Sequence, residues 1–163
     1  MSFHIGFGND IHRLETGKPL ILGGVRIASD RGAVGHSDAD ALAHAVTDAL
    51  FGALALGDIG AHFSDKDPKW KNADSFVFLK QAIEMMKEKS YSVVNVDSTI
   101  ELEKPKLRPF IQAMRENLAR ALEIEIECVS VKAKTGEAVD AVGKSEAVKA
   151  GAVILLTKTT APN

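Results

Sequence analysis

Apolar positions recur every three or four residues in three stretches of the chain, which predicts three amphipathic helices. The first, Ser37–Leu56, has Ser37 as a suitable N-cap, and its many alanines imply close approach to a neighbouring element. The other two are expected over about residues 73–89 and after Pro109. Runs of β-branched and other apolar residues predict strands at Phe3–Phe7, Leu20–Ile27, Val93–Leu102, Val129–Lys134 and Ala150–Thr159.

This order of elements predicts an α+β fold, with a mixed four-stranded sheet, helices packed on one face and a small N-terminal hairpin, in a ferredoxin-like arrangement. Residues 1–163 form a single domain in this interpretation, because no linker or repeat divides the chain. The glycines of Leu20–Ile27, Gly23 and Gly24, indicate a bulge or a close backbone contact. Because a sheet covered on one side leaves its other face without a partner, we also expect self-association.

The composition of the chain argues against several classes of protein. The 163 residues include 20 Lys and Arg against 22 Asp and Glu, and this near balance gives no electrostatic case for binding nucleic acid or an anionic membrane. The chain lacks an apolar run long enough for a membrane span, and its start lacks the pattern of a signal peptide. Cys128 is the single cysteine, which is typical of a reducing compartment. We therefore expect a cytoplasmic protein with neither nucleic acid nor membrane as a partner.

Two short patterns contain metal-ligating residue types. Asp10 and His12 are two residues apart on an extended segment, so their side chains point the same way. His44 lies on the first helix, in a stripe with Asp40 and Asp48 at four-residue spacing. If the two patterns meet, Asp10, His12 and His44 give the layout of a catalytic zinc site, with Asp48 or Asp40 orienting the His44 ring. Taken separately, each pattern also fits ordinary polar surface residues.

Other segments suggest anion or sugar binding, each with a plainer alternative. The amides at the start of the first helix, beside His36 and Ser37, suit an anion, although simple capping by Ser37 needs no ligand. Asp58 lies between glycines and suits a sugar hydroxyl, or it is a solvated loop acid. Lys104–Leu107 is a basic turn that meets phosphate or begins a helix. Glu137, at a strand end, is a candidate Mg²⁺ ligand beside a phosphate.

Taken in order, these segments resemble the 2-C-methyl-D-erythritol 2,4-cyclodiphosphate synthase family of the non-mevalonate isoprenoid pathway. The matching segments in the first half are Gly8–Leu14, Leu22–Val25, Gly35–Asp40, His44–Leu50 and Ala55–Gly60. Those that follow are Phe63 with Asp65, Asp74-Ser75, Lys104–Lys106, and Val131–Ala133 leading to Thr135 and Glu137. No single segment is specific, but the ordered set spans most of the chain and is highly specific.

The resemblance implies an intramolecular phosphoryl transfer. In this family the 2-phosphate of 4-diphosphocytidyl-2-C-methyl-D-erythritol 2-phosphate attacks the β-phosphate of the same molecule, and CMP leaves. The enzymes of the family are homotrimers with active sites between subunits, so the resemblance predicts a trimer. By position, the zinc site, which also accepts another divalent ion, is Asp10, His12 and His44, and the ligand of Mg²⁺ or Mn²⁺ is Glu137.

The resemblance also assigns the remaining site residues. Catalytic roles fall to His36, Ser37, Thr135 and Glu137. Residues that bind the substrate are Asp58, Ile59, Gly60, Phe63, Asp65, Leu102, Lys106, Leu107, Lys134 and Thr135, of which Leu102, Lys106 and Leu107 line up with the cytidine pocket. His4 and His62 receive no role.

Three departures from the family pattern stand out. Phe7 replaces a common histidine, and Ser64 replaces a common proline. The third is Asp140–Lys144, which replaces a stretch that in relatives lines a cavity on the trimer axis able to hold an isoprenoid phosphate. Lys144 keeps a positive charge there, while Ala141 and its neighbours supply no aromatic ring.

Two other functions compete with the synthase reaction at this point. A zinc-dependent phosphoesterase would use the same ligands to activate water rather than to orient a phosphate. A trimeric protein that binds a metal or an isoprenoid phosphate would keep the binding residues without turnover. Release of CMP with a cyclic product distinguishes the synthase from both.

Overall fold

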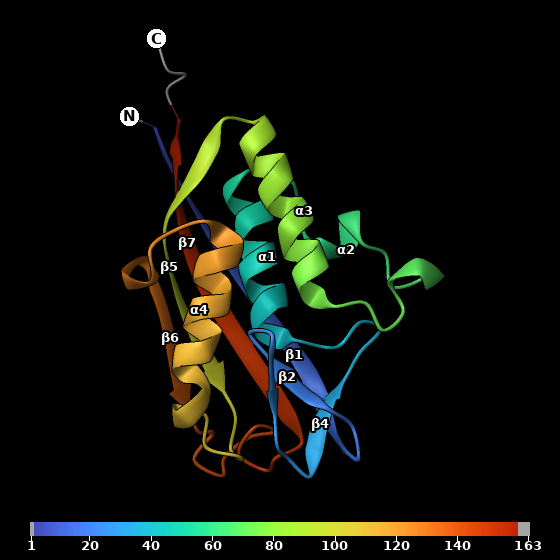
Figure 1. The fold of residues 1–163 in the computed structure, drawn as a ribbon. Helices are drawn as coiled ribbons and strands as arrows, with labels where there is room; N and C mark the ends of the chain where they lie inside the picture. The colour runs from blue at the N-terminus through green and yellow to red at the C-terminus, as the bar shows by residue number, and fades with distance from the viewer. Residues whose placement is uncertain (1, 160–163) are drawn as a thin grey trace.

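The computed structural model describes residues 2–159 (Figure 1). The N-terminal strand, β1 (Phe3–Thr16), is the longest strand of the main sheet. Within the described residues the main sheet has five strands in the order β4-β1-β7-β5-β6, not the four that we expected. The other strands are β4 (Arg31–Val34), β5 (Tyr91–Glu101), β6 (Val129–Lys134) and β7 (Ala147–Lys158). Only the β5–β6 pair of this sheet is parallel, so the sheet is mixed as predicted.

The additional strand is β4, in a segment that the sequence pattern left as a turn. Its four residues pair with the end of β1, from Arg13 opposite Val34 to Thr16 opposite Arg31. Four residues are too few to show a period of two, and their pairing partner lies far away in the sequence. β1 itself extends well beyond the predicted Phe7, because both its neighbours supply backbone partners along its length.

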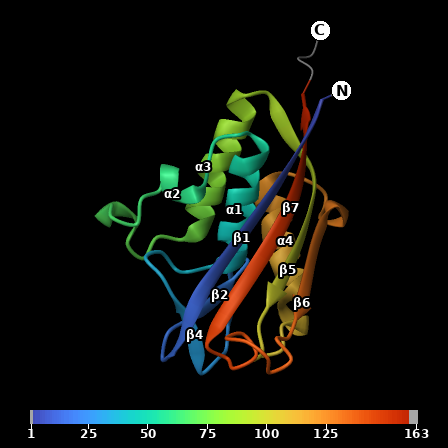
Figure 2. The ribbon, with the colours of Figure 1, turned by 180° about the vertical axis from the view of Figure 1, so that it is seen from behind.

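Helices cover one face of the sheet, as expected. They are α1 (Ala41–Ala53), α3 (Ser75–Glu88) and α4 (Ile111–Leu122), with a short α2 (Ile59–His62) beside α1. Short 3-10 turns occur at Pro68–Trp70, Arg108–Phe110 and Ile126–Cys128. Seen from behind, β1, β7, β5 and β6 lie in front of the helices with no element over them (Figure 2). One face of the sheet is therefore open in the part of the chain that the structure describes.

The predicted strand at Leu20–Ile27 is a hairpin. Its strands are β2 (Leu20–Leu22) and β3 (Val25–Ile27), and they pair antiparallel. Gly23 and Gly24 form the turn with φ values of +57° and +70°, a conformation that glycine adopts without steric cost. The two glycines thus reverse the chain rather than forming a bulge, and this is the small hairpin expected near the N-terminus.

The alanines of α1 let the helix lie directly on β1. A Cβ atom added to Gly8 would be 2.2 Å from the Ala45 carbonyl oxygen, and one added to Gly6 would be 1.9 Å from that of Ala49. Ala45 and Ala49 are themselves completely buried. Because the backbones approach this closely, a side chain on α1 can reach the side chains of β1.

The start of α1 differs from the prediction. The helix begins at Ala41, and its N-cap is Asp40, whose side chain accepts a hydrogen bond from the Ala43 N–H at 3.0 Å. Ala39 has a φ of +58°, which interrupts any helix beginning at Ser37. Ser37 therefore lies in the loop before the helix, where its hydroxyl oxygen accepts the Ala39 N–H at 3.2 Å.

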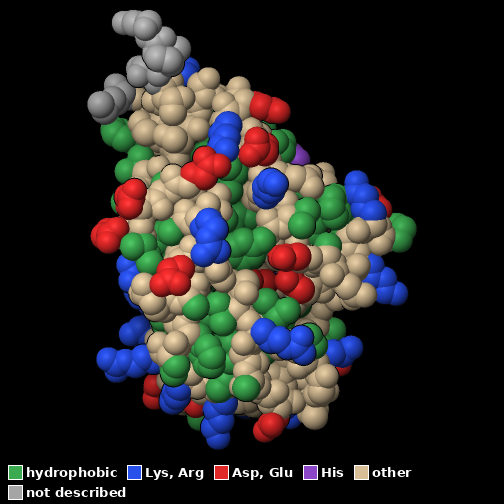
Figure 3. All heavy atoms as spheres, in the orientation of Figure 1, with side chains coloured by type: hydrophobic (Ala, Val, Ile, Leu, Met, Phe, Trp, Pro, Cys, Tyr) green, Lys and Arg blue, Asp and Glu red, His purple; other side chains and the backbone are tan. Residues whose placement is uncertain are grey.

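The helix-covered face carries both signs of charge. Lysine, arginine, aspartate and glutamate side chains are interspersed over it, with apolar side chains between them (Figure 3). Among the described residues, none of the helices has the length and apolar character needed to cross a membrane.

Candidate active site

The structure brings the three predicted metal ligands together. Asp10 and His12 project from the same side of β1, and His44 reaches them from α1. The Asp10 Oδ2 atom lies 2.8 Å from His12 Nε2 and 2.9 Å from His44 Nδ1. The two ring nitrogens are 3.2 Å apart. One oxygen and two nitrogen atoms thus face a common point, as in a site for a divalent metal ion.

The environment of Asp10 keeps its carboxylate ionised. Burial by itself would raise the pKa of Asp10, but hydrogen bonds from the His12 and His44 rings and their positive charge outweigh burial. The net result is a pKa well below the usual range of an aspartate. An ionised carboxylate is the form that binds a metal.

The second ring nitrogen of His44 also has partners. Nε2 lies 2.8 Å from the Ser75 hydroxyl oxygen and 3.1 Å from that of Ser37. Ser75, the first residue of α3, is completely buried. Sequence reasoning gave Ser75 no role, although the pair Asp74-Ser75 is part of the family pattern. A serine at the start of a helix also suits a capping role, so the sequence alone did not indicate that Ser75 belongs to the site.

Neither Asp40 nor Asp48 orients the His44 ring as we expected. Asp40 is completely buried and accepts hydrogen bonds from the backbone N–H groups of Gly23 at 2.9 Å and Gly24 at 2.7 Å, in addition to capping α1. Burial raises the pKa of Asp40 to about 6. Asp48 accepts a hydrogen bond from the Ile59 N–H at 3.0 Å, and burial raises its pKa. The two carboxylates anchor the β2–β3 hairpin and α2.

A cavity of 350 Å³ opens beside His12 and His44. Its wall includes most of the residues predicted to bind the phosphoryl group and the sugar, namely His36, Ser37, Ile59, Gly60, Phe63 and Asp65. Trp70 and Phe78 complete this wall and were not predicted. The Phe63 ring stacks on Phe78 with centroids 4.7 Å apart, so part of the wall is a packed aromatic surface.

Asp58 lines an adjoining cavity of 290 Å³ that also reaches Asp10 and His44. Its side chain accepts the Ala61 N–H at 2.9 Å and so begins α2. On the other side of the first cavity, the His36 ring nitrogen Nε2 donates to the Asp67 carbonyl oxygen at 3.1 Å. The predicted residues of the segments 36–37 and 58–65 therefore surround the metal triad.

The remaining predicted residues lie at the other edge of the sheet. The Thr135 hydroxyl donates to Glu137 at 2.5 Å, and the Gly136 N–H donates to Glu103 at 3.0 Å. Around this turn, Leu102 and Leu107 are buried, whereas Lys106 and Lys134 are exposed. Because β7 and β5 lie between β1 and β6, this group is about 14 Å from the triad at about 4.8 Å per strand. One chain does not bring the two groups together.

Lys144 and Ala141, predicted near a trimer axis, lie exposed in the loop between β6 and β7. The loop is held by its own residues, since Asp140 accepts hydrogen bonds from the N–H groups of Val142 at 2.9 Å and Gly143 at 3.2 Å. Asp140 also pairs with Lys149 on β7 at 2.9 Å.

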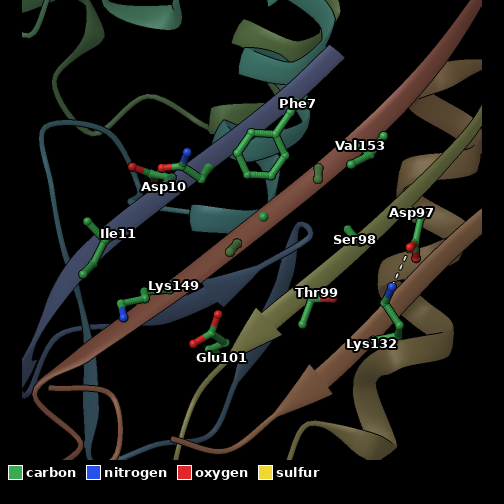
Figure 4. A pocket seen from close by; sticks show the side chains of 14 residues that line it. Phe7, Asp10, Ile11, Asp97, Ser98, Thr99, Glu101, Lys132, Lys149 and Val153 are labelled. Atoms are coloured by element: carbon green, nitrogen blue, oxygen red, sulfur yellow. Dashed lines mark hydrogen bonds and ion pairs between the residues drawn. The ribbon is translucent and has the colours of Figure 1, made fainter. Parts of the chain in front are cut away.

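The open face of the sheet carries a shallow cavity of 470 Å³ (Figure 4). Phe7 and Ile11 project into it from β1, and Val153 projects from β7. Farther along the same face, Lys132 and Asp97 form an ion pair at 2.5 Å. Phe7 is 65% exposed and Ile11 is 54% exposed, so this face presents large apolar side chains to its surroundings.

Comparison with known proteins gives a consistent result. Residues 3–157 match the YgbB family. The sequence is 54% identical over 153 residues to a 2-C-methyl-D-erythritol 2,4-cyclodiphosphate synthase of Solibacter usitatus, covering 94% of this chain and 96% of the relative. It is 57% identical over 148 residues to the enzyme of that name from Salinibacter ruber, covering 91% of this chain and 94% of the relative.

Among solved structures, a CDP complex of IspF from Plasmodium falciparum superimposes with a TM-score of 0.86 at 33% sequence identity, covering 98% of both chains. The similarity therefore extends over the sheet, the helices and both groups of site residues.

Proposed function

The chain belongs to the YgbB family, and we propose on that premise that its site carries out the cyclodiphosphate synthase reaction. It converts 4-diphosphocytidyl-2-C-methyl-D-erythritol 2-phosphate into 2-C-methyl-D-erythritol 2,4-cyclodiphosphate and CMP, in the non-mevalonate route to isoprenoid precursors. The observation that carries this proposal is the convergence of Asp10, His12 and His44 beside the loop that holds His36 and Ser37.

The donor set of the triad fits a zinc ion or a similar divalent metal. Zinc bonds to nitrogen and oxygen are about 2.0–2.2 Å long, so neighbouring ligands of a tetrahedral ion are about 3.3 Å apart. The three separations of 2.8, 2.9 and 3.2 Å are close to that value. The triad leaves a fourth position for a substrate phosphate. A bound ion would supply positive charge that orients the phosphate and offsets the charge that develops during transfer.

His36 and Ser37 would hold the phosphoryl group that faces the triad. The Ser37 hydroxyl can donate to a phosphate oxygen, and both residues line the cavity. The Asp58 carboxylate and the backbone around Ile59 and Gly60 would bind hydroxyl groups of the erythritol or ribose. Phe63 supplies an apolar surface, and Asp65 a further acceptor. These contacts hold the reacting phosphates close together, which is the main requirement of an intramolecular transfer.

The chemistry needs no strong general base. Phosphate oxygens are already ionised at neutral pH, so the 2-phosphate is a nucleophile without proton removal, and CMP leaves as an anion. The task of the protein is positioning and charge stabilisation. Thr135 would contact a phosphate, and Glu137 would hold Mg²⁺ or Mn²⁺, because hard cations prefer carboxylate and phosphate oxygens. Leu102, Lys106 and Leu107, with Lys134 nearby, would form the cytidine pocket.

Two observations support a homotrimer with the active site between subunits. The triad and the Thr135–Glu137 turn lie at different edges of the sheet, so a second chain would supply the group that the first lacks. The open sheet face carries exposed Phe3, Ile5 and Phe7, which a neighbouring subunit would cover. A cyclic assembly satisfies both conditions, because each chain then gives one group and receives the other. A cytoplasmic location, inferred from the single cysteine, belongs to the same proposal.

The direct test is product analysis. The purified protein is incubated with the diphosphocytidyl substrate and Mg²⁺, and the products are followed by ³¹P NMR and chromatography. We expect CMP and the cyclic diphosphate in equal amounts. A hydrolysed, uncyclised product, together with turnover of simple phosphodiesters that lack an internal phosphate, would instead establish a phosphoesterase. Binding of the metal and the nucleotide without any turnover would contradict both enzymatic functions.

A further inference from the structure

The imidazole ring of His44 is held at both of its nitrogen atoms. Nδ1 faces the triad, 2.9 Å from the Asp10 carboxylate. Nε2 points away from it, 2.8 Å from the hydroxyl oxygen of Ser75 and 3.1 Å from that of Ser37. In a neutral imidazole only one nitrogen has a free lone pair, so the position of the ring proton decides whether Nδ1 can bind a metal.

The hydrogen bonds of Ser75 determine that position. Its hydroxyl makes a hydrogen bond to the Asp38 carboxylate. Because a carboxylate only accepts, Ser75 donates its single proton to Asp38. The serine oxygen can then only accept from His44, so the His44 proton lies on Nε2. A metal ion in the triad would take the Nδ1 lone pair in place of the hydrogen bond from Nδ1 to Asp10, while the Nε2–H group stays directed at Ser75.

Ser75 is not needed to cap α3. Asp74 is the N-cap of that helix and accepts the Phe76 N–H at 2.8 Å. The side-chain hydrogen bonds of Ser75 go to Asp38, His44 and Ser37. A fully buried hydroxyl whose partners all belong to the site indicates a role in that site.

Backbone hydrogen bonds hold this arrangement in place. The Asp38 N–H donates to the Ala73 carbonyl oxygen at 2.9 Å, and the Asn72 N–H donates to that of His36 at 2.7 Å. These two bonds join the loop before α1 to the loop before α3. The carboxylate of Asp38 and the hydroxyl of Ser75 are therefore fixed relative to each other by the chain on either side.

We propose that Ser75 and Asp38 are positioning residues of the metal centre. The hydrogen-bonded series Asp38–Ser75–His44 fixes the Nε2–H tautomer of His44 and directs Nδ1 at the ion. This inference rests on the proposed metal centre and adds two residues to it. Residues that hydrogen-bond to a metal-binding histidine keep its ring in the correct tautomer and orientation.

The first test measures metal affinity without substrate. The protein is stripped of metal and titrated with Zn²⁺ against a chromophoric chelator. We expect Ser75→Ala to bind Zn²⁺ about 10–100-fold more weakly than the wild-type protein, the usual loss when a residue that hydrogen-bonds to a metal ligand is removed. Ser98→Ala is the matched control, because Ser98 is also buried and donates one hydrogen bond, to the Ser130 carbonyl at 2.8 Å. Its Zn²⁺ affinity should equal that of the wild type.

A pair of Asp38 variants tests whether Ser75 donates its hydroxyl proton to Asp38. This test can be made even if Ser75→Ala does not fold. Asp38→Ala removes the acceptor, so the Ser75 hydroxyl becomes free to donate to Nε2 of His44, and the Nδ1–H tautomer is favoured. Asp38→Asn keeps an acceptor oxygen. We expect Asp38→Ala to lose affinity about as strongly as Ser75→Ala, and Asp38→Asn to recover most of that loss.

The state of each ring nitrogen is read by long-range ¹H–¹⁵N NMR on Zn²⁺-loaded protein labelled at histidine. The wild type should show His44 bound to zinc through Nδ1, with a proton on Nε2 that exchanges slowly with water, and Ser75→Ala should make that exchange faster because Nε2–H loses its acceptor. Zinc bound through Nε2 of His44 in the wild type, or Ser75→Ala and Asp38→Ala variants with unchanged Zn²⁺ affinity, would overturn the role of Ser75 and Asp38 while leaving the metal centre intact. A wild-type protein that binds no Zn²⁺, Co²⁺ or Mn²⁺ would overturn the metal centre as well.

Discussion

The two groups of site residues are held in opposite ways. Around the triad, each ligand contacts residues from another element, and β1, α1 and α3 all contribute to the positions of the side chains. At the end of β6, Thr135 and Glu137 bond to each other two residues apart, and the Glu137 side chain is exposed. The first group has its geometry within one chain, whereas the second lies open at an edge of the sheet.

In the proposed trimer, this difference divides the active site between two subunits. Metal ligands must be fixed within a fraction of an ångström, so they lie where a helix and a strand pack closely. A phosphate-binding turn with few constraints of its own can gain them when a neighbouring chain and a substrate meet it. The following predictions test the division, from the largest expected effect to the smallest.

His44→Ala removes a ligand from the first group. Removing a residue that hydrogen-bonds to a metal ligand typically lowers metal affinity or activity by about 10–100-fold. Removing the ligand itself should therefore lower CMP release by more than about 100-fold. Bound zinc, measured by elemental analysis, should fall with the activity. The control is His4→Ala, on β1, because His4 bonds to the Ala53 carbonyl oxygen and to Tyr91, not to the site. Retained activity in His44→Ala protein that still folds would exclude a metal centre of this composition.

Glu137→Gln affects the second group. We expect a loss of turnover of about 10–100-fold from the removed carboxylate, with unchanged zinc content, since the triad is far away. The Mg²⁺ concentration required for half-maximal activity should rise. Zinc loss in this variant would show that the two groups are not independent.

Mixing the two variants tests the division directly. If His44 of one chain and Glu137 of another serve the same site, an equal mixture of His44→Ala and Glu137→Gln chains in one oligomer contains some sites with neither change. Random assembly makes about a quarter of the sites intact, so about a quarter of wild-type activity should return after the chains are coexpressed. If each chain contains a whole site, the mixture should be no more active than the average of the two variants.

The sequence predicted the first group better than the second for a physical reason. Spacing along one strand and one helix is local, so the residue pattern placed Asp10 and His12 on one side of a strand and the alanines on one side of α1, and it allowed a metal site without excluding ordinary polar residues. The resemblance named Thr135 and Glu137, but no periodicity placed them relative to the triad. Their relation depends on strand order and, in the proposed trimer, on a neighbouring chain, and neither is a local property of the sequence.

The errors have a similar origin. Ser37 and Asp40 are both good N-cap residues, and only the positive φ of Ala39 and the hairpin amides around Asp40 decide between them. Ser75 was missed because its partner Asp38 is 37 residues away in the sequence. Hydrogen bonds between distant loops leave no pattern in a single sequence.

Gly8→Ala tests the close packing that places His44 over β1. The added Cβ would be 2.2 Å from the Ala45 carbonyl oxygen, so the helix must shift, and we expect a loss of about 3 kcal/mol in the free energy of unfolding. Gly52→Ala is the control within α1, because its nearest atom would be 3.7 Å away and alanine favours a helix. Urea denaturation of both proteins, with chelator present, measures the difference. Equal stability would mean that the backbone contact is not rigid.

The smallest effect is a pH dependence of stability that differs between the two regions. Burial raises the pKa of Asp40 to about 6, above its unfolded value near 3.8, so the folded protein holds this proton more tightly than the unfolded chain does. The contribution of Asp40 to the free energy of unfolding is fully present below pH 3.8 and is lost as the pH rises through 6. Between pH 5 and pH 7 Asp40 should therefore lower the free energy of unfolding by about 1 kcal/mol, and the fall measured in Asp40→Asn should be smaller than that of the wild type by this amount.

Asp140, in the loop after β6, provides the matched control, because its pKa is shifted in the opposite direction to that of Asp40. A hydrogen bond from Lys149 holds the pKa of Asp140 below its usual range, so its contribution to stability is lost only as the pH falls below about 4. Asp140→Asn should keep the wild-type slope between pH 5 and pH 7. The measurement is urea unfolding of metal-free protein at one fixed concentration, because metal binding and subunit association would add their own pH dependence. If Asp40→Asn keeps the slope, Asp40 stays ionised in the folded protein, and the three backbone N–H groups that bond to it outweigh its burial.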